Sequence, residues 1–269
     1  MRPAVLLCLL LVFATPALSA EPPALVKARG AYNSGDYDGA IAAAALARRL
    51  PQEEDAAALV MARSLLEKYR QNAVPTDLSE ARDILVAIRP AMLAPRDQVD
   101  LLIGLGQSLY LADNFGAAAE LFDVALSRSA LLEERDRLML LDWWATTLDR
   151  DAQGRTAERR PRVFERISQR MEEELRRDPG SAPANYWLAV AARGVGDLDG
   201  AWADAVAAWV RATLSPQTAE ALRADLDRLV TQALIPERVR TRPARDQTDA
   251  ANALRIEWET LKSQWKGAQ

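Results

Sequence analysis

Residues 102–126, LIGLGQSLYLADNFGAAAELFDVAL, constrain the fold more than any other part of the chain. Their spacing predicts two short amphipathic helices, with Gly106 on the inner face of the first and Ala118 and Phe122 on the inner face of the second. Gly106 and Ala118 have almost no side chain, so the two backbones can approach while larger residues one turn away fill the flanking space. Asn114 between the helices can cap the second one. The stretch therefore predicts an antiparallel helical hairpin.

The same arrangement of small and large residues recurs along the chain. Four further copies are indicated, at residues 24–51, 55–95, 141–179 and 182–215. A repeat with a period of about 20–50 residues is typical of stacked architectures. Alanine is abundant, aromatic residues are only 6% of the sequence, and no stretch alternates in the manner of a strand. We therefore expect an all-α fold.

The turn of the first copy has a clear local chemistry. Gly35 can end one helix, Asp36 can cap the next, and Asp38 falls in the positively charged first turn of that helix. An Asp-x-Asp-Gly string also suggests a calcium loop. Residues 36–39 and 197–200 both lack the later ligands and the final glutamate of such a loop, so we interpret them as helix caps.

Other parts of the chain are less regular. The second copy has a turn lengthened over residues 71–77, with Pro75 in the loop, and the fourth copy has an extra loop at residues 151–160. After the fifth copy, a helix over residues 217–234 is expected to stop at Pro236. An arginine-rich linker at residues 237–247 should follow.

An amphipathic helix is expected at the end of the chain, over residues 249–266. Its apolar stripe consists of Leu254, Trp258, Leu261 and Trp265. This helix would cap the last repeat, which would otherwise expose an apolar face. A partner-binding surface is the alternative.

Residues 102–126 resemble the tetratricopeptide repeat (TPR), whose pattern is W-x2-L-G-x2-Y, then A-x3-F, then P. Leu105 and Gly106 match the L-G pair, Ala118 and Phe122 match A-x3-F, and leucine replaces the Trp and Tyr. The resemblance implies a right-handed α-solenoid of about five helical hairpins over residues 21–215. Residues 216–269 would form a C-terminal helical capping region.

The resemblance also implies where a partner would bind. TPR proteins hold a protein or peptide in a concave groove lined by the first helix of each hairpin. The positions that carry over are Arg29, Tyr32, Asn33, Arg63, Leu66, Ile103, Gln107, Tyr110, Thr146, Asp149, Tyr186, Val190 and Arg193. Arginine stands where the carboxylate-clamping members have asparagine, so that particular ligand is not implied. A merely solvated groove is the alternative.

The first 20 residues have the features of a secretory signal peptide. Arg2 is positive, residues 5–13 are apolar, and Ser19 and Ala20 are small residues suited to cleavage. An uncleaved membrane anchor is the alternative, but the apolar run is short for a span. We therefore expect a bacterial periplasmic or secreted protein with no stable membrane span.

The amino-acid composition excludes several kinds of catalytic and metal-binding site. Cys8 is the only cysteine and lies in the signal segment, and the chain has no histidine. Histidine-dependent triads and thiol nucleophiles are thereby excluded, and a zinc site would need carboxylates alone. The adjacent glutamates, such as residues 172–174, point in different directions on a helix and are interpreted as a solvated surface. The sequence thus predicts a non-catalytic adaptor without a cofactor, with a carboxylate-dependent glycan-acting enzyme as a weaker alternative.

Arginine is concentrated in two places. Residues 155–162 contain four arginines and residues 237–247 contain another four. Both groups are interleaved with acidic residues and lack the aromatic neighbours that stack on bases, and the net charge of the chain is −4. Nucleic acid is therefore not expected. Binding of an anionic envelope polymer or lipid through these arginines is the alternative to a protein partner, and the oligomeric state stays open.

Overall fold

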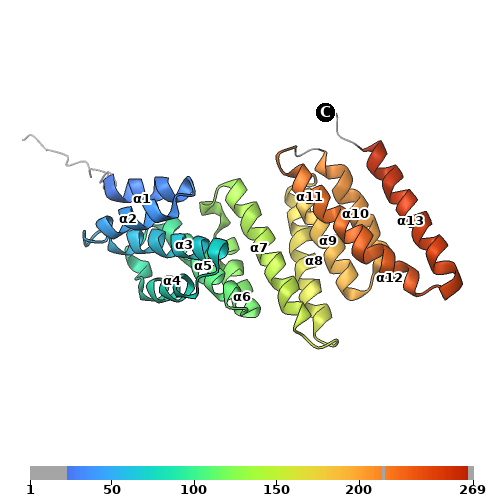
Figure 1. The fold of residues 1–269 in the computed structure, drawn as a ribbon, viewed down its shortest axis with the longest axis horizontal. Coiled ribbons are helices and arrows are strands. Elements are labelled where there is room, and N and C mark those ends of the chain that lie inside the picture. The colour runs from blue at the N-terminus through green and yellow to red at the C-terminus, as the bar shows by residue number, and fades with distance from the viewer. Residues whose placement is uncertain (1–22, 214–215, 266–269) are drawn as a thin grey trace, which may run out of the picture. The chain divides into compact units, whose positions relative to one another are not determined.

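The computed structural model describes residues 23–213 and 216–265. Every regular element in these residues is helical and none is a strand, so the all-α prediction is confirmed (Figure 1). The predicted signal segment, residues 1–20, lies outside the described residues. The helices form two compact units, one up to Met92 and one from Leu93 onward.

The first unit consists of two helix pairs and a short 3-10 turn. Helix α2 packs on α1 and α3, helix α3 packs on α4, and α1 also contacts α3. Small residues such as Ala28, Ala40 and Ala44 are completely buried where the helices approach each other. The elements are α1 (Pro23–Asn33), α2 (Tyr37–Ala47), α3 (Glu54–Asn72), α4 (Pro75–Ala87) and η1 (Pro90–Met92).

The second unit continues in the same way, with three further helix pairs and a C-terminal group. Consecutive helices from α5 to α11 pack on one another, and α9 also contacts α11. The elements are α5 (Pro95–Leu111), α6 (Phe115–Ser127), η2 (Ser129–Leu131), α7 (Glu134–Gln153), α8 (Arg160–Arg177), α9 (Ala182–Val195), α10 (Leu198–Ala212), α11 (Pro216–Leu229), a π-helical turn (Val230–Leu234), α12 (Ile235–Arg240) and α13 (Ala244–Gln264).

The predicted close approach between the helices of residues 102–126 is confirmed. A methyl group added at Gly106 on α5 would lie only 2.4 Å from Cε1 of Phe122 on α6. Ala118 and Phe122 are buried, at 0% and 1% exposure. The glycine therefore sets the distance between the two helices.

The predicted turn chemistry is confirmed at two hairpins. The Gly39 N–H donates to Asp36 Oδ1 at 2.9 Å, and the Gly200 N–H donates to Asp197 Oδ1 at 2.9 Å. The preceding glycine has a left-handed φ in both turns, +80° at Gly35 and +87° at Gly196. Asn114 differs, because it precedes α6 but its side chain makes no capping hydrogen bond.

The loop predicted over residues 71–77 is wrong. The extra residues lengthen α3, which runs to Asn72, and Ala73 turns the chain with φ +53°. Pro75 is the first residue of α4, a position where its missing N–H costs no hydrogen bond. The second long loop is also shorter than predicted, since α7 continues to Gln153 and α8 begins at Arg160.

The stop at Pro236 and the linker after it are likewise wrong. Helix α11 continues through the π-helical turn directly into α12, and only residues 241–243 separate α12 from α13. The wider turn moves the proline ring away from the carbonyl one turn earlier, which an ordinary helix could not do. Pro236 is thus accommodated inside a helical segment.

Helix α13 packs through the predicted stripe. Trp258 is 1% exposed, and its ring lies edge-on to Trp209 on α10 at 5.2 Å between centroids. Its indole N–H donates to Asp227 at 2.9 Å, and Lys262 donates to the same carboxylate. Trp265, at 43% exposure, lies outside this contact. The C-terminal helices therefore share a core with α10.

Candidate functional site

In the first unit, the structure brings two of the predicted binding residues into contact. The guanidinium of Arg63 on α3 lies 4.7 Å from the ring centroid of Tyr32 on α1. Arg29 is half-buried and Asn33 is exposed. Leu66 is fully buried, because α3 packs against α1, α2 and α4, so its placement on an accessible face is wrong.

In the second unit, three predicted residues are buried and cannot form an open surface. Ile103 is 9% exposed and belongs to the hydrophobic core with Phe122. Val190 is 8% exposed on α9, which contacts α8, α10 and α11. Gln107, predicted to be exposed, is 5% exposed. The first helix of a hairpin packs against helices of neighbouring hairpins as well as against its own partner. More of its surface is therefore buried than the residues of a single hairpin predict.

The remaining predicted residues of the second unit are half-buried. The Tyr110 ring packs edge-on to Phe115 at 5.4 Å between centroids. Arg193 makes two hydrogen bonds to Glu237, of 2.7 and 3.0 Å. Thr146 and Asp149 are also half-buried on α7. Arg193 is thus held by an acidic side chain of α12.

Side chains of three helices converge at Tyr186 on α9. Asp149 belongs to α7 and Asp225 to α11, while Asp142 on α7 accepts the Trp187 indole N–H at 2.9 Å. Burial, together with the negative charges of Asp225, Asp142 and Asp149, raises the pKa of Tyr186 to about 12, although the charge of Arg228 opposes this shift. Burial also raises the pKa of Asp149. The tyrosine therefore stays neutral in an acidic surface built from α7, α9 and α11.

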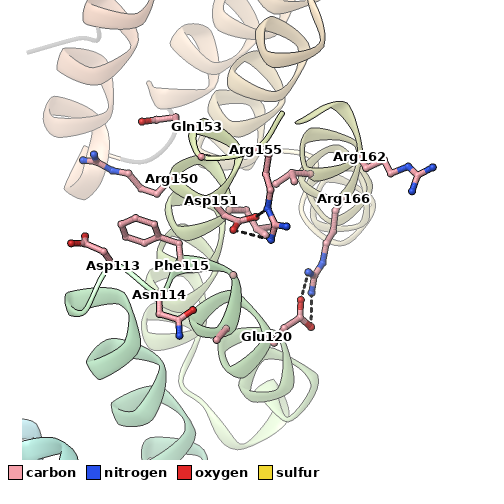
Figure 2. Close-up of a pocket in the computed structure, with 15 residues that line it drawn as sticks. Asp113, Asn114, Phe115, Glu120, Arg150, Asp151, Gln153, Arg155, Arg162 and Arg166 are labelled. Carbon is pink, nitrogen blue, oxygen red and sulfur yellow. Dashed lines mark hydrogen bonds and ion pairs between the residues drawn. The ribbon is translucent and has the colours of Figure 1, made fainter. Parts of the chain in front are cut away.

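A separate cleft of about 1050 Å³ lies elsewhere in this unit (Figure 2). It is formed by the α5–α6 turn, the start of α6, the end of α7, the α7–α8 loop and the start of α8. Four arginines, three carboxylates and the apolar residues Phe115, Leu148 and Val163 line it. Tyr110 packs on Phe115 and so supports its wall. We refer to it as the α6–α8 cleft.

An ion pair occupies the middle of the cleft. Arg155 makes two hydrogen bonds to Asp151, of 3.0 and 3.1 Å (Figure 2). A methyl group added at Gly116 would lie 3.1 Å from Asp151 Oδ1, so this carboxylate lies directly against the start of α6. Helix α6 has no acidic residue in its own first turn. Asp151 therefore supplies the negative charge that a helix N-terminus favours.

One wall of the cleft is held by charged contacts between α6 and α8. Arg166 donates to Glu120 and to Asp123, and Arg170 donates to Asp123. Both guanidinium groups lie over the ring of the buried Trp144, at 5.7 and 5.4 Å from its centroid. The acceptors of Arg166 are thus fixed within the protein.

The other arginines of this region differ in their partners. Arg160 donates to the backbone carbonyls of Ala152 and Arg155 and so holds the end of α7. Arg150 and Arg162 are exposed, and neither has an ion pair within residues 23–213 and 216–265. The sequence had indicated Arg162 but not Arg150 or Phe115. The last turn of α7, directly before the long loop, was the signal available for Arg150.

The second arginine-rich stretch does not form a comparable site. Arg238 is paired with Asp199, and its guanidinium lies 5.1 Å from the ring centroid of Trp202. Arg245 lies near Asp246, its neighbour in the sequence. Arg238 therefore fixes α12 to α10.

The chain was compared with protein families, curated proteins and solved structures. No family model, curated protein or solved structure matches the chain. Within the part of the chain that the structure describes, no helix is both long and apolar enough to span a bilayer. The same residues contain no group of three or more potential metal ligands. The two surfaces of the second unit, around Tyr186 and at the α6–α8 cleft, are therefore the features that can indicate a function.

Proposed function

We propose that this chain is a TPR-like α-solenoid of about five hairpins with C-terminal capping helices, and that it acts as a non-catalytic protein-binding adaptor of the bacterial cell envelope. The resemblance of residues 102–126 to the repeat pattern and the succession of helix pairs support the family assignment. The signal-like residues 1–20 support export. A partner protein or peptide would bind to the surface formed by the first helices.

The observation that carries this proposal is the convergence at Tyr186. A half-buried tyrosine offers a large, rigid contact area at low entropic cost, and such residues dominate the energy of protein interfaces. The negative charges of carboxylates on α7 and α11 act on its hydroxyl. Because separate helices supply these groups, the surface can contact several side chains of one partner.

Photocrosslinking from this surface tests the proposal. A benzophenone amino acid is placed at position 186 of the full-length protein, and in a second variant at position 256, where Ile256 is 67% exposed on α13. After irradiation in living bacteria we expect a discrete crosslinked protein from position 186 only. Substituting Asp149 and Asp225 by Asn in the same protein should reduce that product.

Two crosslinking outcomes would contradict the proposal. If both positions give the same set of products, or if position 186 gives none, the Tyr186 surface is not a binding surface. Circular dichroism and thermal unfolding of each variant establish that the helices are intact.

A further inference from the structure

We propose that the α6–α8 cleft binds an acidic protein segment in which carboxylates flank an aromatic or aliphatic side chain. This site is distinct from the Tyr186 surface and does not depend on the family assignment. The cleft lies within the second unit, and its elements are consecutive in the chain from the α5–α6 turn to the start of α8.

The size and the apolar lining of the α6–α8 cleft suit a protein segment. A volume of about 1050 Å³ is enough for several side chains of a bound segment. Phe115 and Val163 are half-buried in its lining, which also includes Leu148 at 3% exposure. An apolar side chain of a ligand could cover the exposed part of Phe115. The cleft therefore has an apolar contact area next to its charged groups.

The cleft already accommodates one carboxylate, that of Asp151. It accepts two hydrogen bonds from Arg155 and lies against Gly116 at the start of α6. Asn114, which precedes α6, makes no side-chain cap bond. The arrangement shows that this part of the surface is complementary to a carboxylate.

Two exposed arginines of the lining, Arg150 and Arg162, have no ion pair in the described residues. They lie on opposite sides of the Asp151–Arg155 pair in Figure 2, where the extended Arg162 side chain points away from the pair. The lining as a whole has four arginines and three carboxylates, and two of these carboxylates, Asp113 and Glu120, are exposed. Carboxylates spaced along an extended segment could pair with both free arginines.

The negative charges of the three lining carboxylates favour a protein segment over a polyanion as the ligand of the cleft. Asp113, Glu120 and Asp151 would repel the closely spaced charges of a polyphosphate or an anionic lipid surface. A protein segment can place its carboxylates at the arginines and an uncharged side chain between them. Charge complementarity together with the apolar patch thus favours an acidic protein segment.

Fluorescence anisotropy with a defined probe tests the proposal. The probe is a short labelled peptide, blocked at both ends, with glutamates flanking a central phenylalanine; its counterpart has glutamine at each glutamate. We expect saturable binding of the acidic peptide to the purified full-length protein and little binding of the glutamine peptide. The double variant R150Q/R162Q should weaken binding about tenfold or more.

The matched control is R159Q/R240Q. Arg159 and Arg240 are exposed, and this variant changes the net charge by the same amount without altering the lining of the cleft. It should retain nearly the whole affinity. Equal weakening by both double variants would show a general charge effect and overturn the proposal.

Two further measurements separate the alternatives. Tripolyphosphate or vesicles containing phosphatidylglycerol that compete with the peptide more strongly than an unlabelled acidic peptide would overturn the assignment to a protein segment. Photocrosslinking at position 186 should be unchanged in R150Q/R162Q. The peptide titration therefore tests the α6–α8 cleft, and the crosslinking at position 186 tests the Tyr186 surface, independently of each other.

Discussion

The two ends of the α7–α8 helix pair contain the same kinds of side chain in opposite environments. Where α7 begins and α8 ends, Arg137 and Glu174 are each only 6% exposed, and their two hydrogen bonds are 2.6 and 2.7 Å. Where α7 ends and α8 begins, the Arg155–Asp151 pair lies in an open cleft whose lining also includes Arg150 and Arg162. We call these the closed end and the open end.

The difference separates structural arginines from arginines that can bind a ligand. At the closed end, Arg137 donates twice to Glu174 and twice to Glu134, and Arg177 also donates to Glu134. Nearly all donors of Arg137 are therefore used within the protein. At the open end, Arg150 has no such partner among the described residues. The same residue type thus fixes the helix pair at one end and remains accessible at the other.

The largest expected effect comes from breaking the closed end. Glu174→Leu removes a buried carboxylate and leaves Arg137 desolvated with only Glu134 as its partner. Removing one member of a buried pair typically costs about 3–5 kcal/mol. We expect a loss of about 3 kcal/mol in the free energy of unfolding, measured by urea denaturation followed by circular dichroism.

Glu173→Leu is the control, because the Glu173 side chain, at the preceding position of α8, is exposed. The double variant R137M/E174L should recover much of the lost stability, since both charges are then absent. A loss below about 1 kcal/mol for Glu174→Leu would contradict the structural role assigned to this pair.

A smaller effect is expected from the pH dependence of the closed end. Hydrogen bonds from Arg137, together with the charges of Arg137 and Arg177, lower the pKa of Glu134 from 4.5 to about 2. A carboxylate whose pKa is lower in the folded state stabilises the protein above its unfolded pKa, and that contribution is lost as the pH falls toward the folded pKa. Stability should therefore decline between about pH 4.5 and pH 2 in part through Glu134.

Glu134→Gln should flatten this decline. We expect a difference of less than about 1 kcal/mol, because 58% of the Glu134 side chain is exposed and solvent weakens the interaction. Urea denaturation over this pH range compares it with Glu165→Gln, an exposed residue of the same helix pair. If both variants follow the wild-type slope, the ion pairs of Glu134 do not contribute to acid stability.

The closed and open ends also show what could be predicted from the sequence. Turn chemistry is local, so Gly35 with Asp36 and the approach of Gly106 to Phe122 were both predictable. The arginine density of residues 155–162 was visible as well. Phe115 and Arg150 were not identified, because 35 positions separate them and only the register of three helices brings them to one cleft.

The errors have similar physical causes. Leu66 and Gln107 were placed on an accessible face because they match first-helix positions of the TPR pattern, while their burial depends on the neighbouring helices of this chain. Pro236 was expected to stop a helix, since the pattern contains no sign of the π-helical turn that accommodates it. The Gly-Asp turns formed as their residues predict, whereas the cap expected at Asn114 and the helix stop expected at Pro236 did not.

A similarly small effect on stability, but a clear effect on binding, is expected from Asp151→Asn at the open end. The change removes the internal carboxylate that holds Arg155, and because the pair is partly exposed, the stability should change by at most about 1 kcal/mol. Arg155 and the start of α6 then become available to a carboxylate of a ligand. Binding of the acidic peptide should therefore strengthen several-fold in the anisotropy titration.

Asp249→Asn on α13 changes the charge equally at an exposed position outside the cleft and should leave the affinity nearly unchanged. Arg155→Gln should weaken binding, because it removes a donor while leaving Asp151 in place. If Asp151→Asn weakens peptide binding instead, Asp151 positions Arg155 for the ligand, and the view that it occupies a carboxylate site is wrong. Stronger peptide binding by Asp151→Asn would thus show that Asp151 competes with the ligand for Arg155. Weaker binding would show that Asp151 positions Arg155 for the ligand.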